Sequence, residues 1–453
     1  MPRSVEQLRH DAQAIWRAGV RAVQPSELIP NWVSVEGDAL RVGDEALALG
    51  GIGRIGVFGA GKAGAGMVTA LEGALGPGVL AKHAVSGCVN VPADCVVPTK
   101  RIRLHAARPA GVNEPTTDGV AGTRAMLDEA ASLGKHDLCL CLISGGGSAL
   151  LPAPIDGLSL EDKVEITRGL SAAGATIEEL NAVRRELSVV KGGGLLRACG
   201  AGRVVALILS DVLGDPIESI ASGPTVPRAP TPALAIEVLQ RFGLSKSPSG
   251  QRAVALLEES CRRTTETNAS DARVTNLVIG NNAAAVDAAG VEAERRGYNH
   301  AMLSANRSEG PAEEVARSLV EVTRRMRGGA RNDCFISGGE PTVELAPAAE
   351  RGKGGRNQQL VLAALEAEPD WRGLALLSGG TDGEDGPTDA AGAWVDEGVA
   401  AAARSANLSP TDYLRRNDAY RFFEPLGALL KTGPTHTNVC DLRVVLAADR
   451  QAD

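Results

Sequence analysis

The chain has 453 residues, of which 44% are hydrophobic and 3% aromatic, and its formal net charge is −8. This length is typical of two or three domains. An acidic chain without a long basic run argues against nucleic-acid binding, which needs a concentrated positive surface. No apolar stretch approaches the roughly 20 residues that span a bilayer, and the first residues lack the apolar segment of a signal peptide. The eight cysteines form no Cys-x-x-Cys or zinc pattern, so reduced thiols and a cytoplasmic location are expected.

Helices and strands are expected to alternate through the first half of the chain. Ser4 and Gln7 fit a capping box for a helix that runs to about Val23. Ser159 and Thr176, each followed three residues later by an acid, fit capping boxes that open two further helices. The other elements predicted in this half are strands at 54–58, 84–89, 101–105, 138–143 and 203–210 and helices at 63–75 and 117–133.

The second half repeats this alternation after a stretch with four prolines, residues 222–232, which is the best candidate for a domain boundary. Alternating strands and helices imply a second parallel α/β unit. The elements predicted here are helices at 232–242, 250–264, 282–296, 311–326, 357–366 and 396–405 and strands at 274–279, 300–304, 334–337 and 374–378.

The end of the chain is predicted to return to the first lobe. Residues 407–412 are a candidate hinge, and a lone apolar strand ending at Leu446 is expected to complete the first sheet. The predicted fold class is therefore α/β with two lobes, each a mostly parallel sheet flanked by helices. The predicted lobes are residues 1–230 plus 413–453 and residues 231–412.

A short apolar run followed by Ser-Gly-Gly occurs three times, at Ser144, Ser337 and Ser378. Apolar runs of this kind are typical of strands buried on both faces. Glycine at the carboxyl end lets the backbone approach a ligand closely, and ligands in open α/β sheets lie outside those ends. A tight turn without a ligand is the alternative. Two more strand ends of this kind, at Gly59 and Ser210, favour a polyanion site.

The segment Gly59–Gly64 almost matches two phosphate-binding motifs. It fits G-x-G-x-x-G, but the next strand ends without the acid that would bind a ribose. Residues 56–62 also match the pattern G-x-x-x-x-G-K. However, Ala63 replaces the Ser or Thr that would bind magnesium. Both motifs share backbone N–H groups at a helix start that face an anion. Lys62 is disfavoured there by the helix dipole, which indicates a functional role.

A second cation and a group of acids lie in the other half. Arg356 follows a glycine-rich loop and opens a helix, and its planar charge suits a transferring phosphoryl group. The acidic loop 382–389 and Glu340 follow the Ser-Gly-Gly strands; the loop is either a solvated turn or a Mg²⁺ site. Asp211 and Asp215 are either similar ligands or helix caps. His436 is either a base or a loop residue that only forms hydrogen bonds.

Taken together, these segments resemble the glycerate 2-kinase family with a MOFRL C-terminal domain, which is often labelled hydroxypyruvate reductase. The resemblance spans nearly the whole chain. The matching segments are Phe58–Ala63, Leu142–Leu150, Asn181–Arg184, Lys191–Gly194, Ser210–Pro216, Ile220–Thr225, Ser337–Glu340, Gly354–Gln358, Gly380–Gly383 and Gly433–Val439.

The resemblance implies a Rossmann-like N-terminal lobe, a MOFRL-type α/β lobe and an active site in the cleft between the lobes. It implies ATP- and Mg²⁺-dependent phosphorylation of D-glycerate to 2-phosphoglycerate. Lys62 and Arg356 fall on positions that the family treats as essential, and Asp211 is the candidate to orient or deprotonate the 2-hydroxyl. The segment 106–115 departs from the family's usual Gly-His-Pro-x-Pro-Asp pattern, which bears on the choice of substrate.

The remaining candidates are predicted to bind nucleotide, substrate or metal. Asp382 and Asp385 are the expected Mg²⁺ ligands. The residues expected to contact nucleotide or substrate are Gly59, Gly61, Ser144, Gly145, Gly146, Ser148, Asp215, Ser337, Gly338, Glu340, Asn357, Thr381 and Asn438.

Two other functions remain alternatives: an NAD(P)H-dependent hydroxypyruvate reductase, and a nucleotide-binding sensor without catalysis. The expected partners are ATP and D-glycerate, without nucleic acid or membrane, and a homodimer is left open. Absorbance of the reduced nicotinamide separates the reductase from the kinase.

Overall fold

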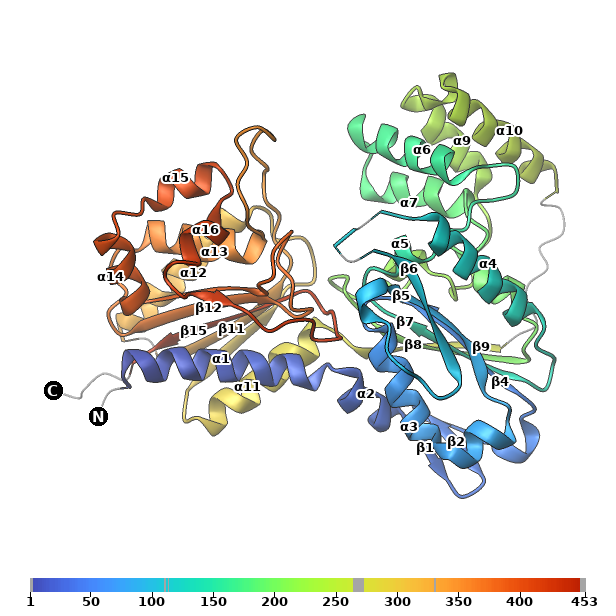
Figure 1. Ribbon diagram of the computed structural model, residues 1–453, viewed down its shortest axis with the longest axis horizontal. Helices are drawn as coiled ribbons and strands as arrows, with labels where there is room; N and C mark the ends of the chain where they lie inside the picture. The colour runs from blue at the N-terminus through green and yellow to red at the C-terminus, as the bar shows by residue number, and fades with distance from the viewer. Residues whose placement is uncertain (1–2, 110, 113, 264–272, 330, 449–453) are drawn as a thin grey trace. The chain divides into compact units, whose positions relative to one another are not determined.

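The computed structural model describes residues 3–109, 111–112, 114–263, 273–329 and 331–448 and divides into two compact units (Figure 1). The N-terminal unit consists of Leu28–Leu209 and Pro216–Ile279. The C-terminal unit consists of Met1–Glu27, Ser210–Asp215 and Gly280–Asp453.

The N-terminal unit is built on a six-stranded sheet in the order β6-β5-β4-β7-β8-β9. The neighbours from β6 to β8 all run parallel, and β4 and β7 are buried along their whole length. This confirms the parallel sheet expected from the continuous apolar runs. Its strands are β4 (Ile55–Ala60), β5 (Ser86–Pro92), β6 (Ile102–Arg108), β7 (Leu138–Ile143), β8 (Arg203–Leu209) and β9 (Arg273–Gly280).

Helices cover this sheet, and a three-stranded antiparallel sheet β1-β2-β3 lies beside α3. A separate apolar core joins α6, α7, α9 and α10. The elements are α2 (Pro25–Trp32), β1 (Val33–Glu36), β2 (Ala39–Val42), β3 (Glu45–Ala48), α3 (Gly64–Lys82), α4 (Thr117–Ala131), α5 (Gly147–Leu150), α6 (Leu160–Ala172), α7 (Ile177–Glu186), α8 (Gly194–Ala198), α9 (Pro232–Arg241) and α10 (Pro248–Arg263), with 3₁₀ turns η1 (Leu49–Gly51), η2 (Ala93–Cys95), η3 (Ile220–Ser222) and η4 (Leu244–Lys246).

Two of the three predicted capping boxes, at Ser159 and Thr176, are complete, and at Ser4 the hydroxyl accepts from the Gln7 amide. The Ser159 hydroxyl accepts a hydrogen bond from the Asp162 amide at the start of α6, and Thr176 does the same for Glu179 at the start of α7. In both cases the acid side chain accepts from the backbone of the capping residue. These caps fix where α6 and α7 begin.

The C-terminal unit contains a mixed six-stranded sheet in the order β10-β11-β15-β12-β13-β14. Strand β10 runs parallel to β11, whereas β15 runs antiparallel to both β11 and β12. The α/β class is confirmed, but the expectation of a mostly parallel second sheet is wrong. The strands are β10 (His300–Ser304), β11 (Cys334–Gly339), β12 (Leu374–Gly380), β13 (Gly392–Asp396), β14 (Leu429–Leu430) and β15 (Asp441–Ala447).

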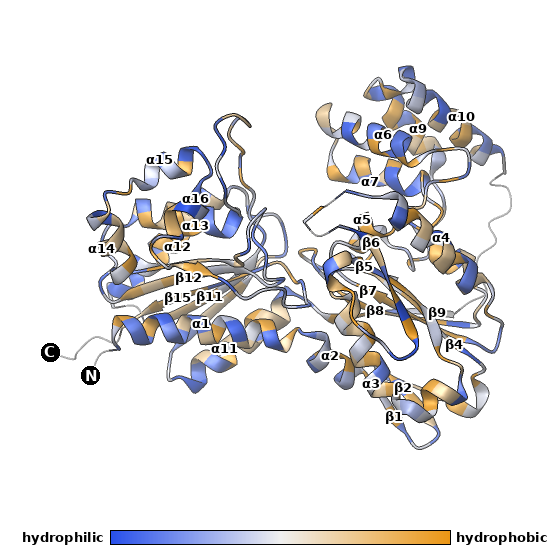
Figure 2. Ribbon diagram, viewed as in Figure 1, coloured by the Kyte–Doolittle hydropathy of each residue, from blue (hydrophilic) through white to orange (hydrophobic). Residues whose placement is uncertain are grey.

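Helices cover both faces of this sheet, which makes three layers. Helices α1 and α11 pack on one face, and α12, α13, α14 and α16 pack on the other. Figure 2 shows hydrophobic colours along the strands and mixed colours on the helices around them. The helices are α1 (Val5–Ala22), α11 (Asn282–Arg295), α12 (Ala312–Arg327), α13 (Arg356–Ala367), α14 (Glu397–Ser405), α15 (Pro410–Arg415) and α16 (Ala419–Phe423).

The predicted lobe boundaries are wrong in three places. Strand β15 belongs to the sheet of the C-terminal unit, not to the first sheet. Helix α1 packs on that same sheet. Helices α9 and α10 pack on α6 and α7, so the proline-rich stretch 222–232 lies within the N-terminal unit.

Burial explains the position of β15. Leu442, Val444 and Leu446 pack into the core beneath α1, and Val445 and Ala447 pack into the core on the opposite face. A strand with apolar side chains on both faces needs helices on both faces of its sheet, and the centre of the C-terminal sheet provides them. Its apolar run is visible in the sequence, but nothing in that run selects one sheet over the other.

None of the described helices is both long and apolar enough to cross a membrane.

Candidate active site

In the N-terminal unit, the carboxyl ends of β4 and β7 are joined through Ser144. The Ser144 hydroxyl is fully buried and accepts from the Ala63 amide at 3.1 Å, while the Ser144 amide donates to the Ala60 carbonyl at 3.0 Å. A Cβ at Gly61 would lie 1.9 Å from the Ser144 Oγ, and one at Gly59 would lie 1.8 Å from the Leu142 carbonyl oxygen. These glycines are needed for close packing of the two strand ends, and Ser144 has a structural role.

Two cations flank the turn after β7. The Lys62 amide donates to the Gly145 carbonyl at 2.9 Å. A Cβ at Gly146 would lie 3.5 Å from Lys62 Cγ and 3.7 Å from Arg108 Nη2. Arg108 is buried at the end of β6, where its guanidinium donates to the Val112 carbonyl. Lys62 and Arg108 therefore meet at the Gly145–Gly146 turn, as an anion site requires.

Arg108 was not predicted as a site residue. It lies in the segment 106–115, whose departure from the usual family pattern is visible in the sequence, but only the fold shows that its side chain lies beside Gly146.

Ser148, at the start of α5, is surrounded by donors. Its hydroxyl accepts from Arg184 Nη2 at 2.7 Å and from Lys191 Nζ at 2.5 Å, and it lies 3.2 Å from the Ser222 hydroxyl. The sequence predicts Ser148 as a binding residue, and the structure places it among two basic side chains.

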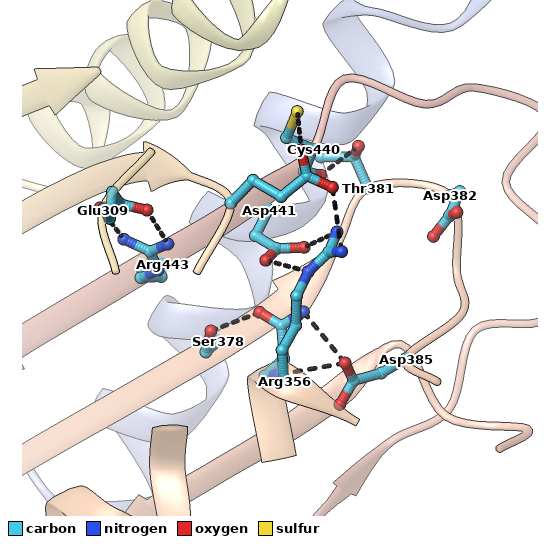
Figure 3. A network of polar contacts seen from close by, with 12 residues as sticks. Glu309, Arg356, Ser378, Thr381, Asp382, Asp385, Cys440, Asp441 and Arg443 are labelled. Carbon is cyan, nitrogen blue, oxygen red and sulfur yellow. Dashed lines mark hydrogen bonds and ion pairs between the residues drawn. The ribbon is translucent and has the colours of Figure 1, made fainter. Parts of the chain in front are cut away.

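In the C-terminal unit, Arg356 is held between two carboxylates (Figure 3). Its Nε and Nη2 donate to Asp441 at 2.7 and 3.0 Å, and its Nη1 lies 3.0 Å from Glu340 Oε1. Asp441 is completely buried, whereas Glu340 is partly exposed. The two carboxylates outweigh the effect of burial and raise the pKa of Arg356, while burial raises the pKa of Glu340. Arg356 is therefore a fixed, permanent cation.

Asp441 owes its position to the strand order. It is the first residue of β15 and pairs with Gly339 at the end of β11 and with Gly380 at the end of β12. The ends of the second and third Ser-Gly-Gly strands therefore lie on either side of the Arg356 partner. The sequence analysis missed Asp441 because its importance depends on where β15 is inserted.

Cys440 adds Asp211 to this cluster. The Cys440 thiol donates to the Asp211 carbonyl at 3.0 Å and lies 3.8 Å from Glu340 Oε2. Burial raises the pKa of the Cys440 thiol, and the carboxylates of Glu340, Asp211 and Asp441 raise it further. Asp211, Glu340 and Arg356, which lie far apart in the sequence, are therefore near one another within the C-terminal unit.

Asp385 caps a helix and is not placed to bind a metal. Its Oδ1 accepts from the Asn357 amide at 3.0 Å and its Oδ2 from the Gln358 amide at 2.8 Å, which are the first N–H groups of α13. The Asn357 side chain is also buried, between Asp385 and the Ser378 hydroxyl. Both carboxylate oxygens of Asp385 and the amide of Asn357 are used inside the fold, so neither fits a ligand contact.

Glycines 338 and 339 make room for protein side chains. A Cβ at Gly338 would lie 1.8 Å from Asn282 Oδ1, and one at Gly339 would lie 1.8 Å from Glu309 Oε2. Asn282 donates to the carbonyls of Val439 and Asp441 at 2.8 and 3.0 Å. These two glycines lie within β11 and serve packing, not a turn, and the neighbouring Ser337 is buried within the same strand.

Thr381 is buried and holds the segment that precedes β15. Its hydroxyl donates to the Cys440 carbonyl at 2.6 Å and accepts from the Val439 amide at 2.8 Å. Asn438 Oδ1 accepts from the Cys440 amide at 3.3 Å, and His436 is exposed with φ +59°. These residues shape the loop that carries Asp441.

Asp382 and Asp215 lie in turns at strand ends. Asp382 Oδ1 accepts from the Glu384 amide at 3.1 Å, and Asp215 accepts from Asn281 Nδ2 at 2.6 Å with φ +54°. No group of three or more His, Cys, Asp or Glu side chains fit to hold a metal occurs among the described residues. The pair Asp382 and Asp385 does not fit a metal site, because Asp385 is the helix cap. Asp382 fits only a magnesium ion bound mainly by phosphate oxygens.

Fold and site together define an α/β protein in which fixed cations lie at glycine-rich strand ends, an arrangement suited to anionic substrates. Comparisons with known proteins identify its family. A domain of unknown function, DUF4147, matches residues 11–258, and the MOFRL family matches residues 333–441.

The chain is similar to several glycerate kinases. A glycerate kinase from Danio rerio is 35% identical over an alignment 495 residues long, which covers 96% of this chain and 97% of that protein. A D-glycerate 2-kinase from Thermotoga maritima is 39% identical over 341 residues, which cover 74% of this chain and 79% of that protein. A crystal structure of the Thermotoga maritima glycerate kinase has a TM-score of 0.81 and 34% identity, covering 98% of this chain and 100% of that one.

This chain belongs to the glycerate kinase family with a MOFRL domain. The resemblance seen in the sequence is thereby confirmed. The other family label also occurs: a protein from Agrobacterium vitis named putative hydroxypyruvate reductase is 37% identical over 403 residues, which cover 87% of this chain and 100% of that protein.

Proposed function

We propose that this protein transfers the γ-phosphoryl group of ATP to the 2-hydroxyl of D-glycerate and releases 2-phosphoglycerate and ADP. The observation that carries the proposal, beside family membership, is the fixed Arg356 guanidinium. Asp441 binds it through two hydrogen bonds, and its Nη1 reaches the partly exposed Glu340. A permanent cation fixed in this way suits phosphoryl transfer, which depends mainly on positioning and on electrostatic stabilisation of the transferring group.

Roles for the other residues follow from their chemistry. Lys62, at the Gly145–Gly146 turn beside Arg108, is proposed to neutralise phosphate charge. Asp211, close to Glu340 and Cys440, is proposed to orient or deprotonate the glycerate 2-hydroxyl. Ser144, Asn357 and Thr381 are proposed to position the turns around these groups, since their own polar atoms are bonded inside the fold.

Magnesium is proposed to act together with ATP. Asp382 is the residue of the predicted pair that fits such an ion, as one carboxylate beside substrate phosphates. When bound, Mg²⁺ would neutralise charge on the phosphate oxygens. The residues of this chain supply the positioning described above.

One assay tests the proposed reaction. Purified protein is incubated with ATP, Mg²⁺ and D-glycerate, ADP formation is followed, and the phosphorylated product is identified by mass spectrometry and NMR. We expect 2-phosphoglycerate, and no product when D-glycerate is left out. ATP binding without turnover would instead support the sensor alternative, and formation of 3-phosphoglycerate would exclude the assigned hydroxyl.

The reductase alternative is tested with the same preparation. Reduced nicotinamide and hydroxypyruvate should give no loss of absorbance at the nicotinamide band, because the strand after the Gly59–Gly64 turn ends in Asn90 and Pro92, without the acid that would bind a ribose. Robust reduction without kinase activity would overturn the proposal.

We further propose that the enzyme works in the cytoplasm with its cysteines reduced. Homodimer formation is testable by light scattering.

A further inference from the structure

Two basic side chains of the N-terminal unit, Lys191 and Arg184, converge on one neutral residue, Ser148, and a third, Lys163, lies near them. Lys191 donates to both the carbonyl and the hydroxyl of Ser148, at 2.9 and 2.5 Å. Arg184 Nη2 donates to the same hydroxyl at 2.7 Å. Burial lowers the pKa of the Lys191 amine, and the nearby charges of Arg184 and Lys163 lower it further. We call Lys163, Arg184 and Lys191 the basic cluster.

The two lysines of the basic cluster are buried and Arg184 is half-buried, without an acid among the described residues to balance them. Lys163 and Lys191 are 6% and 2% exposed, and Lys163 Nζ has no hydrogen-bond partner among the described residues. Across the described part of the chain, no carboxylate lies within ion-pair distance of any of the three. Burial and the charge of Arg184 lower the pKa of Lys163 to about 7. Uncompensated buried charge of this kind is costly and is rarely kept without a purpose.

Backbone strain beside the basic cluster adds an independent observation. Ala221, Ser222 and Gly223 are consecutive residues with φ of +49°, +64° and +61°. The amides of Gly192 and Gly193 donate to the carbonyls of Ser222 and Gly223 at 2.9 and 2.7 Å, which holds this turn against the one that carries Lys191. The Ser222 hydroxyl thereby lies 3.2 Å from that of Ser148. Strain that persists in this way is typical of ligand-binding sites.

We propose that the basic cluster, with the hydroxyls of Ser148 and Ser222, binds the carboxylate of the acceptor, a small 2-hydroxy acid. This inference rests on the proposed function and assigns a specificity site to it. An arginine and two lysines can donate hydrogen bonds to both oxygens of a carboxylate. The bound carboxylate would supply the negative charge that the basic cluster lacks.

The position of the basic cluster agrees with a three-carbon acid. Ser148 follows Gly146 by two residues, a backbone span of at most about 7 Å. A Cβ at Gly146 would lie 3.5 Å from Cγ of Lys62, the residue proposed to bind phosphate. The basic cluster and Lys62 therefore lie at the same glycine-rich turn, so the carboxylate and the reacting hydroxyl of one small substrate can be bound side by side there. The glycine-rich turn beside Lys62 already offers a place for polyphosphate.

The test compares Arg184→Gln and Lys163→Met with the control Arg168→Ala. Arg168 lies on α6 and is exposed, paired with the exposed Glu114, so its removal deletes a charge of the same unit outside the basic cluster. D-glycerate and ATP binding are measured separately by calorimetry, and KM is measured for both substrates. We expect Arg184→Gln to weaken D-glycerate binding at least about tenfold, since one charge-assisted hydrogen-bond donor is lost. ATP binding and the control should stay within about twofold.

Stability separates this proposal from a structural role. Lys163→Met removes a buried amine that has no partner, so the variant should unfold at the same or a higher temperature than the unmodified protein when no substrate is present. It should nevertheless bind D-glycerate more weakly, and the thermal stabilisation that D-glycerate gives should shrink. A variant that loses both stability and binding of ATP would indicate a structural role and overturn the proposal.

An uncharged analogue identifies the group that is recognised. The unmodified protein should prefer D-glycerate to its methyl ester, and Arg184→Gln should reduce that preference at least about tenfold. Weaker ATP binding with D-glycerate binding intact would assign the basic cluster to the donor phosphates and overturn the carboxylate assignment. Because D-glycerate binding is measured without turnover, a protein that binds D-glycerate but forms no product contradicts the proposed function and leaves this inference standing.

Discussion

Arg356 opens helix α13, at the end where the helix dipole disfavours a cation. The structure compensates this in two ways. Asp385 accepts from the first amides of the helix, and Asp441 and Glu340 bind the guanidinium itself. A side chain supported by three acids is placed with little freedom, which favours electrostatic stabilisation without reorganisation during the reaction.

Removing either predicted catalytic cation should slow the reaction strongly. We expect Arg356→Ala and Lys62→Ala each to lose at least about 10²-fold in kcat, with a smaller effect on KM for ATP, because the charge matters most in the transition state. Arg356→Lys should recover little, because a point charge cannot replace the planar fork that donates two hydrogen bonds to Asp441. Steady-state kinetics measure the loss, and circular dichroism confirms that the variants fold. Turnover within a few-fold of the unmodified enzyme would contradict the assigned roles.

Asp385 should make stability depend on pH. Burial raises its pKa to about 7, above the value of about 3.9 expected in the unfolded chain. The contribution of this group to stability is therefore fully present below about pH 4 and is lost as the pH rises through about 7. Asp385→Asn does not titrate, so the unmodified protein should lose more stability than the variant between pH 5 and pH 8. Urea unfolding of both proteins at the two pH values measures the difference, and equal losses would show that Asp385 is already ionised in the folded protein at pH 5.

At the scale of elements, the Ser-Gly-Gly strand ends combine two roles. In β4 and β7 the glycines let backbones meet beside Lys62, whereas in β11 they leave space for Asn282 and Glu309. The sequence therefore predicts the strands and their carboxyl ends well, because buried apolar runs and glycine are local signals. It does not separate ligand-binding glycines from packing glycines, because that depends on which side chain faces each Cα.

Gly338→Ala should disturb the Arg356 site from a distance. The added Cβ would displace Asn282, whose amide donates to the carbonyl of Asp441 at 3.0 Å. We expect a loss of about 1–3 kcal/mol in stability, typical of overpacking a core, together with reduced kcat. Gly73→Ala is the matched control, because Gly73 is exposed in α3 with open space around its Cα. That substitution should stabilise the protein by about 0.5–1 kcal/mol and leave kcat unchanged. Denaturant titration and steady-state kinetics measure both, and similar effects of the two substitutions would show that Asn282 does not transmit the change.

The site residues that sequence reasoning missed have a common reason. Asp441 matters because β15 enters the sheet between β11 and β12. Lys163 enters the proposed carboxylate site because it is buried beside Arg184. Neither position stands out locally: an acid before a strand and a lysine in an amphipathic helix are ordinary features of a surface. Lys62, Arg356 and Asp211 could be proposed from the sequence because glycine-rich turns mark them.

At the scale of the whole molecule, each unit has its own sheet and its own cores, although the C-terminal unit is assembled from three separate stretches of chain. The proline-rich stretch 222–232, which the sequence suggested as the domain boundary, lies inside the N-terminal unit. The true division follows long-range strand pairing, which no local pattern records.

Deleting the residues from Asp441 onward should unfold one unit and spare the other. Without β15, β11 and β12 lose the strand that joins them, and the apolar face under α1 loses Leu442, Val444 and Leu446. The N-terminal unit keeps all its strands. Hydrogen exchange should show protection retained in β4, β7 and β8 and lost in β11 and β12. Protection of β11 and β12 in the truncated protein would contradict this.

The position of β15 also has a consequence for how the protein is made. Helix α1 emerges from the ribosome early, but the sheet against which it packs contains a central strand that is translated about four hundred residues later. At roughly 5–20 residues per second, α1 waits roughly 20 to 90 s for that strand. During this time Leu8, Ile15 and Trp16 have no completed sheet to cover them, so a nascent chain that stalls before β15 presents an apolar helix to chaperones and proteases.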